Sequence, residues 1–469
     1  MTLHIDYANC LADRVGAHGL APEALATAGP TLTRLTEQLN QRRGTGPERW
    51  RRLPFDPARR EHVEAVTRLA QELRPKTDHL VVLGIGGSAL GNTALHAALN
   101  PHTYNFLPRE ERGGPRLFVL DNVDPHLVRQ TFDEVRRADP GFERTLVNVI
   151  SKTGETAETA AQFLIARSIL AEALGDRHAD HLVAITDPKA GTLRAVADAE
   201  GYATLPVPEG VGGRFSVLSP VGLFSAAMCG IDIEAILDGA AAMDDRCSDR
   251  SPRRNPAATL AWLLVAFARR GRTIHVLMPY CNALGGLADW YRQLWAESLG
   301  KRVDLEGNEV FAGATPIRAL GTTDQHGQVQ LYREGPHDKV IGMIEVERFE
   351  DDITIPADLD VESLRYLQGS TLGGLLAAQK RATEYALVES QRPNYTITFP
   401  RLDAYHVGQF IQLWEITTAY AALLLNVDAY DQPAVETGKA VTFGLMGRPT
   451  YEKWQVTVDR PPSDTPWVL

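Results

Sequence analysis

The feature that most constrains the fold is the alternation of short apolar runs with longer segments typical of helices. The first runs are rich in Val, Leu and Ile and read HLVVLGIGG, RLFVLDN, TLVNVIS, HLVAITD and YATLPVP. Between most of them lie helix-like segments such as ETAAQFLIARSILAEAL. Continuous apolar strands that alternate with helices indicate a parallel sheet covered by helices on both faces.

A second series begins near Arg253 with the helix-like segment NPAATLAWLLVAFARR. Its strand-like runs are TIHVLMP, ATPIRAL, KVIGMIEV and YTITFP. Long helices are predicted over 361–390 and 406–425. We therefore expect an α/β fold with two domains of similar style, each a mainly parallel sheet flanked by helices.

Four regions are predicted along the chain. The first forty or so residues are typical of helices, and the basic stretch QRRGTGPERWRRLP, broken by Pro and Gly, follows them. A polar, helix-like segment at 230–255 suits a connector. The expected divisions are 1–55 (an N-terminal helical segment), 56–240 (the first α/β domain), 241–430 (the second) and 431–469 (a C-terminal helix and tail).

Composition argues against several classes of protein. The formal net charge of −11 is mild for 469 residues and is not concentrated in blocks, which argues against nucleic acid as the main partner. No window approaches the ~18 continuous apolar residues of a membrane helix, and MTLHIDYANC does not resemble a signal peptide. The four cysteines lack CxxC spacing, and no HExxH pattern occurs, so neither disulfides nor a metal site is expected. A soluble cytoplasmic protein is predicted.

The motif LGIGGSALG follows a strand-like run and opens a helix. Its glycines, with Gly87 and Ser88 at the helix start, allow a ligand to approach backbone N–H groups that attract anions. GIGGSA also satisfies a loose dinucleotide fingerprint, but Asp121 lies 37 positions beyond Gly84, further than the usual spacing of about 20. An anion or sugar site is the first interpretation, a bare turn the second and a dinucleotide site the third.

The motif ISKTGETAET places hydroxyl groups and a lysine before another helix. Ser151, Lys152, Thr153 and Thr156 exceed what a single N-cap requires, and they suit a phosphate held by side chains, backbone N–H groups and the helix dipole. A plain N-cap remains the alternative for any one of them.

The stretch QLWAESLGK places Glu297 near a predicted helix end, with Gly300 and Lys301 after it. Glu297 is three residues after Leu294 and extends an apolar stripe, and Gln293 shares its face. Partial burial and the negative end of a helix dipole both favour the protonated form of a carboxyl group, which suits a general base near neutral pH. A surface glutamate at a frayed end is the alternative.

Three further motifs carry candidates of lower specificity. Arg214 follows a run of glycines in GVGGRFS, which favours a role in stabilising negative charge over an exposed surface arginine. His326 lies in the polar stretch GTTDQHGQVQ and is a weak candidate by itself. Gln432 and Lys439 are seven apart in DQPAVETGK, where a charged surface helix with a Glu436–Lys439 pair is favoured on spacing alone.

Taken together, these motifs resemble the phosphoglucose isomerase family. The most specific segments are GGRFS, QLWAESLGK and YDQPAVETGK, and the resemblance runs from GIGGSALG to DQPAVETGK. It implies two sugar-isomerase domains, the first with the phosphate loop, and a C-terminal region that contributes to the active site. It also implies cofactor-free interconversion of glucose 6-phosphate and fructose 6-phosphate by a homodimer with shared active sites.

The resemblance also implies a role for each matched residue. Glu297 would move the proton between C2 and C1, Arg214 would stabilise the cis-enediolate, and His326 of the neighbouring subunit would act in ring opening. Lys439 would assist proton movement at oxygen. The substrate would be held by Ser151, Lys152, Thr153, Thr156, Gln293 and Gln432 at the phosphate, and by Gly87 and Ser88 at the sugar.

One residue departs from the family pattern, because Ala434 stands where the C-terminal signature usually has glycine. Two other functions are considered. A sugar-phosphate-binding regulator without catalysis usually carries a basic recognition helix, which is not evident here. A dinucleotide-dependent oxidoreductase would rest on GIGGSA alone.

Overall fold

The computed structural model describes residues 2–455, and two compact units make up the chain, Met1–Ala429 and Tyr430–Leu469. Both large sheets belong to the first unit, and α17 (Ala434–Leu445) belongs to the second. The other helices are α1 (Ala12–Val15), α2 (Ala24–Arg42), α3 (Ala58–Leu73), α4 (Gly87–Leu99), α5 (Arg109–Arg112), α6 (Pro125–Ala138), α7 (Ala157–Leu174), α8 (Thr192–Glu200), α9 (Pro220–Met228), α10 (Ile233–Cys247), α11 (Pro256–Arg269), α12 (Gly285–Leu299), α13 (Thr323–Gly327), α14 (Val329–Glu334), α15 (Leu372–Glu389) and α16 (Ala404–Leu425).

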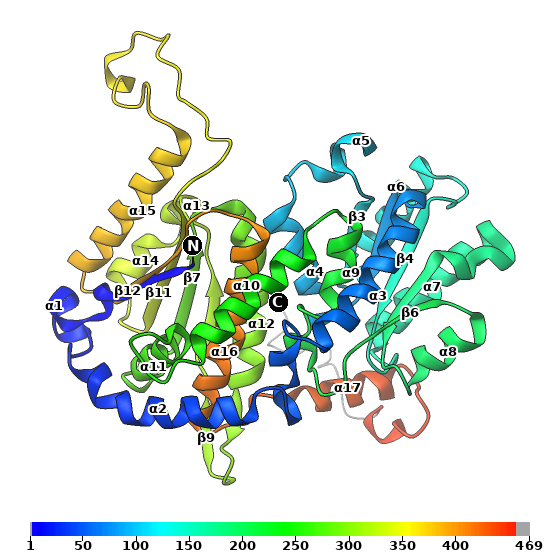
Figure 1. Ribbon diagram of the computed structural model, residues 1–469, viewed down its shortest axis with the longest axis horizontal. Helices are drawn as coiled ribbons and strands as arrows, with labels where there is room; N and C mark the ends of the chain where they lie inside the picture. The colour runs from blue at the N-terminus through cyan, green and yellow to red at the C-terminus, as the bar shows by residue number, and fades with distance from the viewer. Residues whose placement is uncertain (1, 456–469) are drawn as a thin grey trace, which may run out of the picture. The chain divides into compact units, whose positions relative to one another are not determined.

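The first sheet is parallel throughout and has the order β3-β2-β4-β5-β6 (Figure 1). Every residue of β2, β4 and β5 is buried, because helices cover both faces of these strands. The bounds are β2 (His79–Leu83), β3 (Arg116–Leu120), β4 (Thr145–Ile150), β5 (Leu182–Thr186) and β6 (Ala203–Pro206). The predicted alternation of strands and helices is confirmed for this part of the chain.

The second sheet has the order β1-β12-β11-β7-β10, in which β1 alone runs antiparallel to its neighbour. A hairpin of β8 (Lys301–Val303) and β9 (Glu309–Ala312) stands apart from it. The bounds are β1 (His4–Asp6), β7 (Ile274–Pro279), β10 (Thr315–Arg318), β11 (Lys339–Val346) and β12 (Asn394–Phe399). The expected fold class, two mainly parallel sheets flanked by helices, is confirmed.

Two local expectations are wrong. The sequence predicts helix for the first residues, but His4–Asp6 form an edge strand that pairs with β12, with Asp6 opposite Thr396. A strand of three residues has no periodic signal of its own. The helix predicted from Val361 begins only at Leu372, because Gly369 has a φ of +77° and the Thr371 hydroxyl caps the new helix by accepting from Gly374 N at 3.0 Å.

The segment at 230–255 is helical as expected, but α10 packs deeply against α16. A Cβ on Gly239 would lie 1.8 Å from the Tyr405 carbonyl oxygen, and one on Gly408 would lie 1.9 Å from that of Ile236. The buried carboxylate of Asp244 forms an ion pair with Arg51 at 2.9 Å, which ties the basic N-terminal stretch to this pair of helices. Close backbone contact and a buried ion pair therefore join segments far apart in sequence.

Glu415 lies in the middle of α16 and is fully buried. Neither carboxyl oxygen has a hydrogen-bond partner among residues 2–455. Burial, and then the charge of Asp244, raise the pKa of Glu415 well above its usual value. The folded protein therefore binds a proton that the unfolded chain releases above about pH 4.5.

Stability should accordingly fall as the pH rises above the unfolded pKa of this group. In that window Glu415 costs about 1.4 kcal/mol of unfolding free energy per pH unit, and Glu415→Gln, which is neutral at every pH, removes this contribution. We expect the melting temperature of the variant to exceed that of the wild type more at pH 8 than at pH 5. Glu362→Gln, at an exposed position, is the control; identical pH profiles for wild type and Glu415→Gln would contradict the prediction.

Candidate active site

Two of the predicted ligand motifs follow neighbouring strands of the first sheet. The chain leaves β2 towards β3 on one side and leaves β4 towards β5 on the other, which opens a crevice at the carboxyl ends of β2 and β4. Gly87 and Ser88 begin α4 after β2, and the segment 151–156 lies between β4 and α7. Both segments therefore reach the same edge of the sheet, where ligands bind in folds of this type.

The glycine motif is packed closely by two other segments of the first unit. Gly86 has a φ of +57°, and a Cβ there would lie 2.7 Å from Gln293 Nε2. A Cβ on Gly87 would lie 2.1 Å from the carbonyl oxygen of Gly213. These glycines are needed because the backbone after β2 contacts both α12 and the loop before Arg214.

A polar group forms where these segments meet. Arg214 Nη1 lies 3.5 Å from Glu297 Oε2, and Gln293 Nε2 donates to the same oxygen at 3.2 Å. The Arg214 side chain is only 4% exposed, whereas that of Glu297 is 26% exposed. The carboxylate is therefore positioned by two donors and still accessible to a small molecule.

Arg214 is fixed by two further hydrogen bonds. Its Nε donates to the hydroxyl of Ser298 at 2.7 Å, and its Nη2 donates to the carbonyl of Ala429 at 2.5 Å. Its backbone lies in the short 3-10 helix Gly213–Phe215, where the Ser216 hydroxyl donates to the Gly213 carbonyl at 2.6 Å. A guanidinium held in this way presents a fixed positive charge that does not need to reorganise when negative charge develops nearby.

The geometry of α12 follows from its sequence. The helix ends at Leu299 before Gly300, as expected, and Lys301 Nζ donates to the carbonyl of Glu297 at 2.8 Å. Gln293 and Glu297 are one turn apart at the border of the buried stripe and are both half-buried. Glu297 is thus partly shielded from water, but it lies at the edge of the buried face of α12. The fully buried positions at this end of the helix are Ser298 and Leu299.

The phosphate motif uses some of its hydroxyl groups to shape its own loop. Ser151 is buried, and its hydroxyl accepts from Gly154 N at 3.0 Å, while the Thr153 hydroxyl accepts from Glu155 N at 3.2 Å. Thr156 occupies the N-cap position of α7, but its side chain makes no capping hydrogen bond. The loop therefore presents the start of α7 and the Thr156 hydroxyl at the crevice edge without the plain N-cap that was the alternative.

His326 lies in α13 and is exposed. Asp324 fixes this short helix, because its carboxylate accepts from Leu320 N at 2.6 Å and from Gln328 Nε2 at 2.8 Å. The two side chains that position the Glu297 carboxylate come from α12 and from the loop of Arg214, and His326 is not one of them. The chain around His326 thus holds an imidazole that faces solvent.

The last two predicted residues belong to the second unit. Lys439 lies in α17 and forms an ion pair with Glu436 at 2.7 Å, the surface pair favoured on spacing. The expectation that Gln432 shares a helical face with Lys439 is wrong, because Pro433 precedes the first helical residue, Ala434, and Gln432 lies outside the helix.

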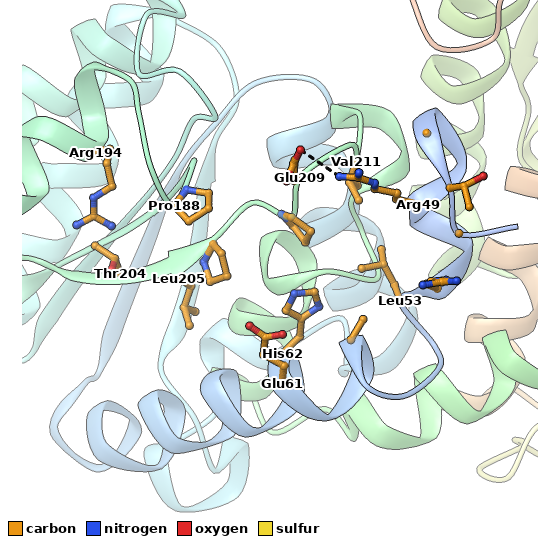
Figure 2. A pocket seen from close by; sticks show the side chains of 17 residues that line it. Arg49, Leu53, Glu61, His62, Pro188, Arg194, Thr204, Leu205, Glu209 and Val211 are labelled. Carbon is orange, nitrogen blue, oxygen red and sulfur yellow. Dashed lines mark ion pairs between the residues drawn. The ribbon is translucent and has the colours of Figure 1, made fainter. Parts of the chain in front are cut away.

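A cavity of about 880 Å³ lies close to the loop that leads to Arg214 (Figure 2). Arg49, Glu209 and Val211 lie near one another in its lining, with an ion pair of 3.2 Å between Arg49 and Glu209, and His62 lies beside Glu61 on α3. None of the predicted site residues lines this cavity. It is therefore distinct from the crevice at β2 and β4.

Neither a candidate metal site nor a membrane-spanning helix is found in the part of the chain that the structure describes. Within residues 2–455, no three His, Cys, Asp or Glu side chains are grouped so that they could hold a metal ion. The helices of the same part of the chain include none that is long and apolar enough to span a membrane.

Comparison with known proteins identifies the family. The family model described as phosphoglucose isomerase matches residues 71–459. The chain belongs to the phosphoglucose isomerase family. The family predicted from the motifs is thereby confirmed.

Relatives in the phosphoglucose isomerase family align along nearly the whole chain. A glucose-6-phosphate isomerase of Carboxydothermus hydrogenoformans is 42% identical over 454 residues, which cover 97% of this chain and 96% of that protein. One of Rubrobacter xylanophilus is 47% identical and covers 84% of this chain and 89% of that protein. The crystal structure of a hypothetical protein of Thermus thermophilus superposes with a TM-score of 0.84 at 38% identity, over 95% of this chain and all of that one.

A more distant member shows the same fold. The crystal structure of a glucose-6-phosphate isomerase of Chlamydia trachomatis has a TM-score of 0.70 at 24% identity, over 83% of this chain and 74% of that one. The architecture of mainly parallel sheets flanked by helices is therefore shared across large differences in sequence.

Sequence reasoning missed two groups that position Arg214. Ser298 is seven residues after Tyr291 and four after Leu294, so the apolar period of α12 would have indicated that its hydroxyl is buried. The carbonyl of Ala429 had no such signal, because any residue type supplies a carbonyl and only the fold brings this one to the guanidinium.

Proposed function

We propose that the chain interconverts glucose 6-phosphate and fructose 6-phosphate by ring opening and proton transfer through a cis-enediolate. The observation that carries the proposal is the partly accessible Glu297 carboxylate with a fixed guanidinium nitrogen of Arg214 3.5 Å from it. Membership of the phosphoglucose isomerase family, and the glucose-6-phosphate isomerases among its relatives, support the same reaction.

Proton movement between two adjacent carbons requires one base that takes the proton and returns it. Glu297 removes the proton from C2 of the open-chain aldose, the C–H electrons form the C1=C2 double bond, and the carbonyl electrons move to O1. The negative charge of this enediolate is stabilised by Arg214. Glu297 then returns the proton to C1 while the O2 proton moves to O1, which gives the ketose.

The phosphate group of the substrate is assigned to the loop before α7. Its N–H groups and the dipole of α7 favour an anion, and the side chains of Ser151, Lys152, Thr153 and Thr156 supply donors and a positive charge. Gln293 and Gln432 are assigned to the same group, and Gly87 and Ser88 to the sugar. Gln293 can reach a phosphate oxygen only through its Nε2 group, which also donates to Glu297 Oε2 at 3.2 Å and has a second N–H.

Ring opening is assigned to His326 of a second subunit, with assistance from Lys439. Exposure of His326 on a short helix supports this role, because a group that completes a neighbouring site must face outward in its own chain. Large exposed apolar side chains also support a homodimer, among them Leu305 and Phe311 of the β8–β9 hairpin and Tyr366 between β11 and α15. The segment that carries Tyr366 extends away from the second sheet (Figure 1).

Shared active sites can be tested by mixing two inactive variants. Each dimer site would combine Glu297 of one chain with His326 of the other, so a mixed dimer of Glu297→Gln and His326→Gln chains keeps one intact site. Half of the dimers are mixed after equal exchange and one site in two is intact, so about a quarter of wild-type activity should return. Absence of recovery, with subunit exchange verified by mass-tagged chains, would place His326 outside the neighbouring site.

The activity itself is tested by following fructose 6-phosphate conversion in a coupled assay with EDTA present. Turnover at ordinary enzyme rates supports the isomerase, whereas saturable binding of the sugar phosphate without turnover would support a regulator instead. We infer a cytoplasmic location from the substrate and from the thiols, since Cys10, Cys229, Cys247 and Cys281 are all free.

A further inference from the structure

A cluster of cationic side chains lies where three strands of the second sheet begin. Parallel strands start at a common edge, which here is opposite to their carboxyl ends. Arg270 and Arg272 precede β7, His337 precedes β11, Arg392 precedes β12, and His18 reaches this edge from the short 3-10 helix Gly16–His18. These five residues are called the cationic cluster.

The two histidines of the cationic cluster are stacked. Their ring centroids are 3.7 Å apart and their planes differ by 7°. Arg272 Nη2 lies 3.0 Å from His18 Nδ1, and a guanidinium can only donate, so Nδ1 accepts and the hydrogen of the neutral His18 ring is on Nε2. His337 and Arg270 are exposed and His18 is half-buried, so these three side chains form the outer surface of the cluster.

Buried guanidinium groups lie beneath this surface. Arg272 is 4% exposed and Arg392 is 7% exposed. Within residues 2–455, Arg272 Nε and Arg392 Nη1 have no hydrogen-bond partner. Each is a donor removed from water, and such groups in a folded protein require an explanation.

The cationic cluster has backbone partners, and its neighbouring acid is paired with a lysine. Arg392 donates to the carbonyls of Arg333 and Gly335, and Arg270 donates to that of Ala17 at 2.9 Å. Asp338, next to His337 in the chain, forms an ion pair with Lys339 at 2.5 Å. Carbonyl groups satisfy N–H donors without neutralising their charge, so the positive charge of the cluster is only partly balanced.

The titration of the cluster reflects this imbalance. Burial lowers the pKa of His18, and the charges of Arg272, Arg392 and Arg270 lower it further. Burial and then Arg392 lower the pKa of His337, and burial followed by Arg270 lowers the pKa of Arg272. Every one of these groups would be stabilised in its charged form by an added negative charge.

We propose that the cationic cluster binds a small tetrahedral oxyanion of the sulfate and phosphate class. The imidazole N–H groups of His18 and His337 donate to the oxyanion at the surface, and the guanidinium groups of Arg272 and Arg392 supply positive charge beneath it. The bound anion ties the N-terminal turn at His18 to the chain before β11. It thereby stabilises the second sheet at the edge opposite to the carboxyl ends of its parallel strands.

The test is equilibrium dialysis of the wild-type protein with radiolabelled sulfate. Saturating fructose 6-phosphate is included so that the sugar phosphate occupies the phosphate loop. We expect one sulfate per chain to remain bound. His18→Ala/His337→Ala should weaken this binding about tenfold or more, because two donors are lost, and should leave isomerase activity unchanged. The single variant His337→Ala, at an exposed position, should weaken it without any risk to folding.

His126→Gln is the matched control, since His126 is exposed and outside the cluster. Two results would overturn the proposal. Sugar phosphate could displace all bound sulfate, which would confine anion binding to the phosphate loop. Alternatively, the remaining sulfate could bind equally well to the wild type and to the double histidine variant, which would place it elsewhere on the protein.

Discussion

Replacement of Glu297 by glutamine is expected to lower kcat by about 10²- to 10⁴-fold, the contribution of a general base. The amide keeps the shape of the side chain and can still contact Arg214 and Gln293, so the surrounding helix should not change. KM for fructose 6-phosphate should change much less, because the phosphate group is held by another segment. Steady-state kinetics in both directions and solvent-deuterium exchange at C2 measure the effect.

The control for this variant is Glu110→Gln, since Glu110 is exposed on α5. It should retain wild-type kinetics. Loss of proton exchange at C2 together with loss of turnover would place the defect at proton transfer. Near-normal turnover of Glu297→Gln would exclude Glu297 as the base and would require another carboxylate or a histidine in that role.

Replacement of Arg214 by lysine is expected to lower kcat by about 10²- to 10³-fold, the typical cost of removing one preorganised charge-stabilising group. A lysine keeps the positive charge but cannot reach Ser298, Ala429 and Glu297 from one planar fork. Its charge would therefore be mobile where the enediolate forms. Inhibition by a hydroxamate analogue of the enediolate should weaken in parallel with kcat, whereas substrate KM should change little.

Arg292→Lys is the control for this variant, because Arg292 is exposed on α12 and pairs with Asp289 at 2.6 Å. It should leave kcat and inhibitor affinity unchanged. An Arg214→Lys protein with normal kcat would show that fixed guanidinium geometry is not needed. Equal loss of substrate and inhibitor affinity would instead assign Arg214 to ground-state binding.

The fold class could be predicted from sequence because it depends on local periodicity. Buried strands such as β2 and β4 need apolar residues at every position, and their runs are visible without any knowledge of the partners. The motifs that follow these strands lie at strand ends, as predicted, because the end of each apolar run marks the end of its strand. The helix end after Glu297 is also local, since Leu299, Gly300 and Lys301 carry the signal.

The predictions from sequence are wrong where a second local signal competes with the apolar pattern, or where the segment is too short to have a pattern. The helix predicted from Val361 starts too early because its apolar residues continue upstream, while the positive φ of Gly369 and the Thr371 cap set the true beginning. Spacing alone places Gln432 on a helix, although Pro433 marks the boundary. The edge strand β1 is too short to have a period.

By itself the sequence determined the alternation of strands and helices, the strand ends that carry the ligand motifs, and Glu297 near the end of a helix. Only the tertiary structure decided how Arg214 is held. Its guanidinium donates to the Ser298 hydroxyl, 84 positions further along the chain, and to the Ala429 carbonyl, 215 positions further along. It likewise brought together the five members of the cationic cluster. The physical reason is that periodicity reports which face of an element is buried, whereas contacts between distant segments depend on how those faces pack.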